Sequence, residues 1–303
     1  MSPLLLAGYA TLLMLAAPRL AGAGWVARAP RLAVAAWLAL TAALLLSGVL
    51  AGVGLMLYWD CTHDLVAGAW HACLDALLGR HHRRAHAAAL AGLAALLLLG
   101  ARLALGADRS YAARRALRSR LRLLVRMTAP DAIPGATVVA HPHPAAYLVP
   151  GRAADIVITT AAVNRLAPPE LSAVLAHERG HHAGRHYRAV HWTRLLAEAF
   201  PRVLCFRLAR QQVDRLVELC ADDTAARSTR RIDLARALVA MSSPPPPTAD
   251  GALCAQGGDA LERLHRLLAP PRPLSRTTRA GIAVTCPLLP LVPLTLALID
   301  RLA

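Results

Sequence analysis

The residues His177-Glu178-Arg179-Gly180-His181 combine two histidines and a glutamate at a spacing that suits metal chemistry. On a helix, His177 and His181 point the same way about one turn apart, so both imidazoles can reach one metal ion. Glu178 lies beside that face, where a carboxylate can accept a proton from water during hydrolysis of a peptide bond. The pattern therefore predicts one zinc ion per chain, with His177 and His181 as ligands and Glu178 as the general base.

The alternative interpretation is a surface helix with scattered histidines, since the chain contains 13 of them. Glutamate is rare, however, with five in 303 residues, so this pattern is not expected by chance. The segment also begins as helices do. Pro168 and Pro169 suit a first turn, and Glu170 suits the positive end of the helix dipole. We therefore favour the metal site.

Two histidines leave a catalytic zinc ion short of one protein ligand, which a glutamate on a later helix can supply. A helix predicted from 213 to 231 stacks Asp214, Glu218 and Asp222 one turn apart, which costs helix stability unless cations lie nearby. A metal ion facing Glu218 would relieve this repulsion, and Asp222 could then accept the free ring N–H of His177. The alternative is a solvated acidic face paired with arginines, and spacing alone does not decide between the two.

Composition indicates an integral membrane protein. The chain is 56% hydrophobic, has a mean hydropathy of +0.43 and contains long runs of leucine and alanine. Its net charge of +16 comes entirely from arginine, because it contains no lysine. In a membrane protein such a balance reflects cytoplasmic loops and anionic lipid, so the lipid bilayer is the expected partner and no direct contact with nucleic acid is expected.

Apolar runs predict four transmembrane helices, at about residues 3–20, 32–58, 87–105 and 281–299. Arginines gather between the first two helices, after the third and before the fourth. The positive-inside rule makes that side cytoplasmic and puts both termini outside, as in a multi-pass protein of a bacterial plasma membrane. Three arginines between the second and third helices depart from this pattern.

The expected fold is mainly α, with a cytoplasmic α+β zincin-like peptidase domain between the third and fourth membrane helices. The domains expected are a three-helix membrane region at 1–108, the peptidase domain at 109–279 with a proline-rich linker at 242–250, and a last membrane helix at 280–303.

Shorter elements are expected inside the peptidase domain. A basic amphipathic helix is predicted at 110–127, and a charged, interfacial helix pair broken at Pro201 is predicted at 190–211. Strands are predicted at 137–140, 145–149 and 155–159. The candidate edge strand for binding substrate as an added strand consists of Ala145, Ala146, Tyr147 and Leu148, with a plain hairpin as the alternative.

Several segments together resemble a known family. They read Asp155-Ile-Val-Ile-Thr-Thr, Leu171-Ser-Ala-Val-Leu-Ala-His-Glu, Phe200-Pro-Arg-Val-Leu and Glu218-Leu-Cys-Ala-Asp222. HExxH followed by ExxxD is the pattern of gluzincin peptidases, and the order of segments resembles the BlaR/MecR-type antirepressor membrane metallopeptidases. The resemblance implies zinc ligands at His177, His181 and Glu218, a general base at Glu178, and Asp222 as the partner of a ligand histidine. It also implies a cytoplasmic winged-helix repressor as the substrate, together with the protease itself.

The resemblance does not extend to the extracellular penicillin-binding sensor of the β-lactam receptors, because the sequence ends at Ala303. We therefore expect an activating signal to enter elsewhere, for example through the outer loop at 59–86. In that loop Cys61 and Cys73 can form a disulfide in an oxidising exterior, or bind a metal ion together with two nearby histidines. The disulfide is the favoured alternative.

Two rival functions stay open at this point. One is a housekeeping quality-control peptidase of the HtpX or CAAX prenyl protease kind, which carries membrane helices between HExxH and the glutamate. The charged interval at 190–211 argues against it. The other is a non-catalytic membrane sensor or scaffold with a structural zinc ion, against which the presence of Glu178 argues. The oligomeric state is open, a homodimer included.

Overall fold

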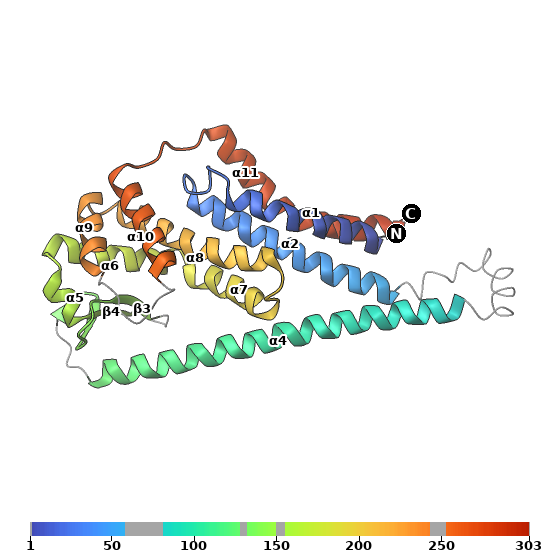
Figure 1. The fold of residues 1–303 in the computed structure, drawn as a ribbon, viewed down its shortest axis with the longest axis horizontal. Coiled ribbons are helices and arrows are strands. Elements are labelled where there is room, and N and C mark those ends of the chain that lie inside the picture. Colours follow the sequence, from blue (N-terminus) through green and yellow to red (C-terminus); the bar gives the residue numbers. More distant parts are fainter. Residues whose placement is uncertain (1, 58–80, 128–131, 150–154, 243–252, 303) are drawn as a thin grey trace.

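The computed structural model describes residues 2–57, 81–127, 132–149, 155–242 and 253–302. Long helices form one end of the molecule, and a small sheet with shorter helices forms the other (Figure 1). The predicted disulfide pair, Cys61 and Cys73, lies outside the described residues.

Three helices in the described part of the chain are long and apolar enough to cross a membrane. Helix α1 runs Ser2–Ala21, and helix α2 runs Pro30–Leu57 without a charge after Arg31. Helix α4 runs His81–Met127, with its apolar window at Ala87–Arg109. The three candidate spans agree with those predicted from hydropathy.

The basic segment predicted as a helix at 110–127 is helical, and it forms the last part of α4, which continues through it without a break. The physical reason is that α4 contains no proline and is rich in alanine, leucine and arginine, which favour a continuous helix. Near its start, α4 packs closely on α2. A Cβ added to Gly92 would lie 2.6 Å from the carbonyl oxygen of Gly52, so small residues allow this approach.

The predicted fourth span consists of two helices. Helix α11 runs Arg276–Leu288 and helix α12 runs Leu291–Leu302, and the bend between them is 47°. Prolines at 287, 290 and 293 explain the break, since proline removes a helical N–H donor and clashes with the preceding turn. Four membrane crossings result if the bent pair is one span. The hydroxyl of Tyr9 on α1 donates to the carbonyl of Leu289, which ties the pair to α1.

The long apolar helices have one set of ends toward the sheet and the other set at the opposite end of the molecule. The α1–α2 connector, the end of α4 and the start of α11 lie toward the sheet, whereas the two termini lie together at the far end (Figure 1). Two hydrogen bonds join the sheet-side ends of these helices to the rest of the chain. Arg31 on α2 donates to Thr224 at 2.9 Å, and Arg28 donates to the carbonyl of Arg272 at 3.1 Å.

The sheet has four strands in the order β1-β2-β4-β3. They are β1 (Ala132–Ile133), β2 (Ala136–Val139), β3 (Ala146–Val149) and β4 (Asp155–Thr159). β2 pairs parallel with β4, and the other pairs are antiparallel. The three longer strands were predicted to within one residue, and β3 is an edge strand. Ala145 precedes β3, and its carbonyl accepts the backbone N–H of Thr159 at 2.9 Å.

In the described residues, six helices accompany the sheet at its end of the molecule. They are α5 (Thr160–Arg165), α6 (Pro168–Ala183), α7 (His186–Ala199), α8 (Leu204–Ala225), α9 (Arg231–Met241) and α10 (Leu253–Leu268). Helix α6 packs against α8 and β3. The helix predicted at 213–231 begins earlier and ends earlier than expected. Its apolar face already starts at Cys205 and Phe206, which are buried.

Helices α7 and α8 join the long apolar helices to the end of the molecule that holds the sheet. One buried cluster contains Trp37 and Leu40 of α2 together with Leu196 of α7 and Leu216 of α8. The indole N–H of Trp192 also donates to Thr41 of α2 at 3.0 Å. The interval between the HExxH helix and Glu218 therefore packs against membrane helices despite its charges.

Candidate metal centre

Helix α6 presents the HExxH residues toward α8. Its start is fixed by Pro168 and Pro169 and by Glu170, whose carboxylate accepts the backbone N–H of Ala167 at 2.9 Å. His177 is buried, whereas His181 and Glu178 are partly buried. This half of the site follows directly from the local sequence.

Helix α8 supplies the opposite half. Glu218 lies 3.4 Å from Nε2 of His177 through Oε2, and 3.3 Å from Nε2 of His181 through Oε1. The two Nε2 atoms are 3.1 Å apart. Donor atoms of His177, His181 and Glu218 lie within 4.8 Å of one another, so the three residues could hold one metal ion.

The donor set fits zinc. Two imidazole nitrogens and a carboxylate oxygen form the ligand set of many catalytic zinc sites, with a further position open for water or substrate. Here the two ring nitrogens face each other across a short gap, with the Glu218 carboxylate beside both. Such short distances between donor atoms are expected where three side chains bind the same metal ion.

Asp222 lies behind His177. Its Oδ1 is 2.9 Å from Nδ1 of His177, a contact that meets the distance of a hydrogen bond but not its angle. We therefore regard it as a close charge pair. Burial alone would lower the pKa of His177, but Asp222 and Glu218 outweigh it and raise this pKa to about 9. Burial alone would raise the pKa of Glu218, but His177, His181 and an arginine hold it well below its ordinary range.

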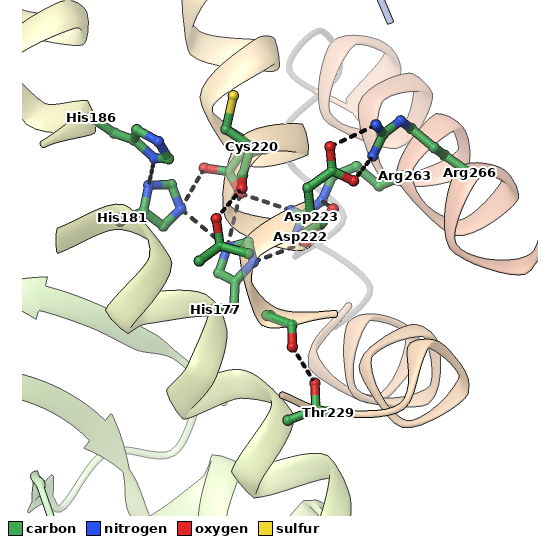
Figure 2. A network of polar contacts seen from close by, with 12 residues as sticks. His177, His181, His186, Cys220, Asp222, Asp223, Thr229, Arg263 and Arg266 are labelled. Atoms are coloured by element: carbon green, nitrogen blue, oxygen red, sulfur yellow. Dashed lines mark hydrogen bonds and ion pairs between the residues drawn. The ribbon is translucent and has the colours of Figure 1, made fainter. Parts of the chain in front are cut away.

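His186 at the start of α7 supports the second histidine. Its Nδ1 lies 3.1 Å from Nδ1 of His181. Figure 2 shows the two rings facing each other. Burial is the main cause that lowers the pKa of His186 to about 4, so its ring is neutral near pH 7. His182, by contrast, is exposed. The arrangement lets a neutral His186 orient the His181 ring and keep its Nε2 toward Glu218.

Glu178 lies between the histidines and the edge strand. Burial raises the pKa of its carboxyl, although His177 and His181 counteract this, and the carboxylate accepts the backbone N–H of Leu148. A cavity of about 490 Å³ opens here, lined by β3, α6, α7 and α8, with Ala146, Tyr147 and Leu148 on its strand side. The predicted base and three of the four predicted strand residues thus share one cavity.

The contribution of helix α10 was not predicted from the sequence. Arg263 of this helix contacts both Glu218 and Asp222 (Figure 2). The amphipathic pattern of α10 could have indicated a buried face, but no local pattern indicates which carboxylates it meets. Gly180, whose lack of a side chain lets α6 approach α8, was likewise not predicted to have a role.

Comparison with known proteins agrees with this geometry. Residues 113–213 match the model of peptidase family M48. The matched segment contains the sheet and the HExxH residues, and it ends at Val213, before Glu218. Neither a curated protein nor a solved structure matches the chain significantly.

The match and the His-His-Glu group together indicate a gluzincin-type metallopeptidase domain in a mainly helical chain with apolar helices suited to a membrane. Membrane-bound peptidases of this class act with zinc. The BlaR/MecR type in particular is not singled out by the match.

Proposed function

We propose that this chain is a membrane-integrated zinc endopeptidase that hydrolyses peptide bonds at the membrane surface. The observation that carries the proposal is the convergence of His177, His181 and Glu218 beside Glu178. A structural metal site needs no base, whereas here a carboxylate with a raised pKa faces the same cavity as the ligands.

His177, His181 and Glu218 would hold the metal ion. Bound there, zinc supplies Lewis acidity and makes water nucleophilic near neutral pH. Glu178 accepts the proton of the attacking water and passes it to the leaving amine. Asp222 and His186 keep the two imidazole rings in place by their contacts with the outer ring nitrogens.

Strand β3 is the proposed binding edge for the substrate. Ala145 faces β4 through the hydrogen bond to Thr159, and alternation therefore turns the backbone groups of Ala146 and Leu148 away from β4. Both residues line the cavity beside Glu178. Because the N–H of Leu148 donates to Glu178, an extended substrate segment can add to this edge through Ala146 and the carbonyl of Leu148, with its scissile bond near the base.

For the biological role we propose signalling, by cleavage of a cytoplasmic winged-helix repressor and of the protease itself. The resemblance to BlaR/MecR-type antirepressors, noted above, supports this role. The proposed orientation is a cytoplasmic peptidase domain with both termini outside. It is supported by the arginine-rich connectors, which lie at the peptidase end in Figure 1.

A second candidate function is quality control of membrane proteins, as in HtpX-like or CAAX-protease-like enzymes. The observation that favours it is the packing of α7 and α8 against α2, with Trp192 bonded to Thr41. The charged interval therefore does not argue against this candidate as strongly as the sequence alone indicated.

The test compares wild type with Glu178→Gln, both purified with bound zinc quantified. The substrates are a repressor encoded next to the gene, a destabilised membrane protein and the chain itself. We expect about one zinc per chain in both proteins and cleavage by wild type alone. Glu170→Gln is the matched control on the same helix, because glutamine also accepts the N–H at this position, and it should cleave normally. Absence of zinc from well-folded wild type would contradict the proposal.

A further inference from the structure

Arg263 of α10 holds two carboxylates of α8 at once. Its Nη1 donates to Oε2 of Glu218 at 2.9 Å. Its Nε and Nη2 donate to Oδ2 and Oδ1 of Asp222, both at 2.8 Å. The side chain is 16% exposed, so these charge-assisted hydrogen bonds are largely shielded from solvent. Neither the HExxH motif nor the ExxxD motif includes this residue.

The contacts treat the two oxygens of Glu218 differently. Each oxygen faces one ligand histidine, Oε2 at 3.4 Å from Nε2 of His177 and Oε1 at 3.3 Å from Nε2 of His181, but only Oε2 also accepts a hydrogen bond from Arg263. A carboxylate with one oxygen held in this way presents the other one to a metal ion. The geometry of Glu218 thus favours a single ligand oxygen, Oε1.

The contacts of Asp222 link the guanidinium to a histidine. Oδ1 of Asp222 lies 2.8 Å from Nη2 of Arg263 and 2.9 Å from Nδ1 of His177. Since Asp222 is 1% exposed on its side chain, it cannot exchange these partners for water. The fork of Arg263 therefore fixes the oxygen that in turn orients the His177 ring.

Charge gives a second reason for an arginine at this place. Glu178, Glu218 and Asp222 crowd three carboxylates around one centre. Burial alone would lower the pKa of Arg263, but these carboxylates outweigh it and raise this pKa. Like charges one helical turn apart repel, and a permanently protonated guanidinium relieves this without competing for protons. A lysine would supply the charge but not the planar fork.

We propose that Arg263 is a positioning residue of the metal centre, which holds Glu218 so that Oε1 binds zinc and holds Asp222 against His177. The proposal rests on the proposed function, since it assumes that these residues bind zinc. It extends the site to α10, a helix beyond the matched segment that ends at Val213.

Two neighbouring ion pairs also attach α10 to α8, but outside the metal centre. They make it possible to distinguish a positioning role of Arg263 from a role in attaching α10. Arg266 pairs in the same two-pronged manner with Asp223, at 2.6 and 2.8 Å, and donates to the carbonyl of Ala27. Arg215 of α8 pairs with Glu262 of α10. Arg266 is 9% exposed, less than Arg263, and anchors the same helix, but its hydrogen bonds go to Asp223 and Ala27 rather than to the metal centre. It is the matched control.

The experiment measures zinc affinity of the full-length protein in detergent by competition with a chromophoric chelator. Wild type is compared with Arg263→Gln, Arg263→Lys and Arg266→Gln. We expect a loss of about 10- to 100-fold for Arg263→Gln, a smaller loss for Arg263→Lys and a change of less than about threefold for Arg266→Gln. X-ray absorption of zinc-loaded Arg263→Lys should show added carboxylate coordination, because Oε2 is less firmly held.

The outcomes distinguish failure of the positioning role of Arg263 from failure of the proposed function. Equal affinity of wild type and Arg263→Gln, or equal losses for Arg263→Gln and Arg266→Gln, overturns the positioning role while the peptidase assignment stands. If wild type itself binds no zinc, the proposed function fails instead. If Arg263→Gln does not fold by circular dichroism, Arg263→Lys decides, and wild-type affinity with an unchanged absorption spectrum in that variant overturns the proposal.

Discussion

Gly180 of α6 lies against Ala221 of α8 so closely that an added Cβ on the glycine would be 3.1 Å from the Ala221 carbonyl oxygen. The glycine lies between the two ligand histidines in sequence, and Ala221 lies between Glu218 and Asp222. The contact of two backbones therefore sets the distance between the two halves of the metal centre. A side chain at position 180 would make a contact tighter than most real Cβ contacts, so the helices would have to move apart by a few tenths of an ångström.

Gly180→Val is expected to separate α6 from α8 and to weaken zinc binding by at least about tenfold, because the two nearest obstructing atoms belong to the backbone of Ala221 and cannot rotate away. Ala183→Val is the control, since Ala183 is exposed on the same helix. It costs helix propensity, whereas replacing glycine by valine gains some, so a loss of zinc seen only in Gly180→Val cannot come from propensity. Chelator competition measures the affinity, and wild-type binding by Gly180→Val would contradict the prediction.

His186→Phe should weaken zinc binding by about 10- to 100-fold, because phenylalanine fills the space of the ring but cannot contact Nδ1 of His181. His182→Phe is the control, as His182 is exposed beside the same site. Gly184→Ala is expected to act like His186→Phe, since an added Cβ would lie 2.1 Å from Nε2 of His186 and displace its ring. Zinc content after dialysis against a weak chelator ranks wild type and the three variants by zinc affinity.

Much of this centre could be predicted from the sequence, because its first half is local. Two histidines and a glutamate within five residues of a helix determine their own relative placement. The same holds for β3 and β4, which are short, largely apolar runs in a segment that proline and glycine interrupt, and for the apolar spans.

The remaining features depend on contacts between distant segments. Arg263 meets Glu218 across 45 residues, and Trp192 meets Thr41 across 151. The length of α8 was mispredicted for a related reason. Its first turns look charged in sequence, but Cys205 and Phe206 are buried against other helices. Tertiary packing, which no local pattern reports, decides such elements.

Zinc affinity should depend steeply on pH. In the metal-free protein Asp222 and Glu218 raise the pKa of His177 to about 9, although burial alone would lower it. Because zinc binds only the deprotonated ring, affinity is expected to rise about tenfold per pH unit from neutrality toward pH 9 and then to level off. Calorimetry in buffers of different ionisation enthalpy should show about one proton released per zinc at pH 7.5. Binding without proton release would contradict the raised pKa.

The same shift has a consequence for the stability of the metal-free protein. The folded pKa of His177 lies above its ordinary 6.5, so the stabilising pair is fully present below about pH 6.5 and is lost as pH rises through about 9. The melting temperature of the metal-free protein should therefore fall over this interval. His177→Gln, which cannot titrate, should show a weaker dependence over the same interval.

Leu216 tests whether the membrane helices and the metal centre form one cooperative unit. It is fully buried on α8 within the cluster that includes Trp37 and Leu40 of α2. Leu216→Ala should cost about 2–5 kcal/mol, because it leaves a cavity between the two elements. Leu204→Ala, on the same helix at a position 49% exposed, should cost much less. Since Glu218 lies half a turn from Leu216, zinc release on heating should shift together with unfolding of the helices. If zinc release and unfolding shift by different amounts in Leu216→Ala, the two regions are not one cooperative unit.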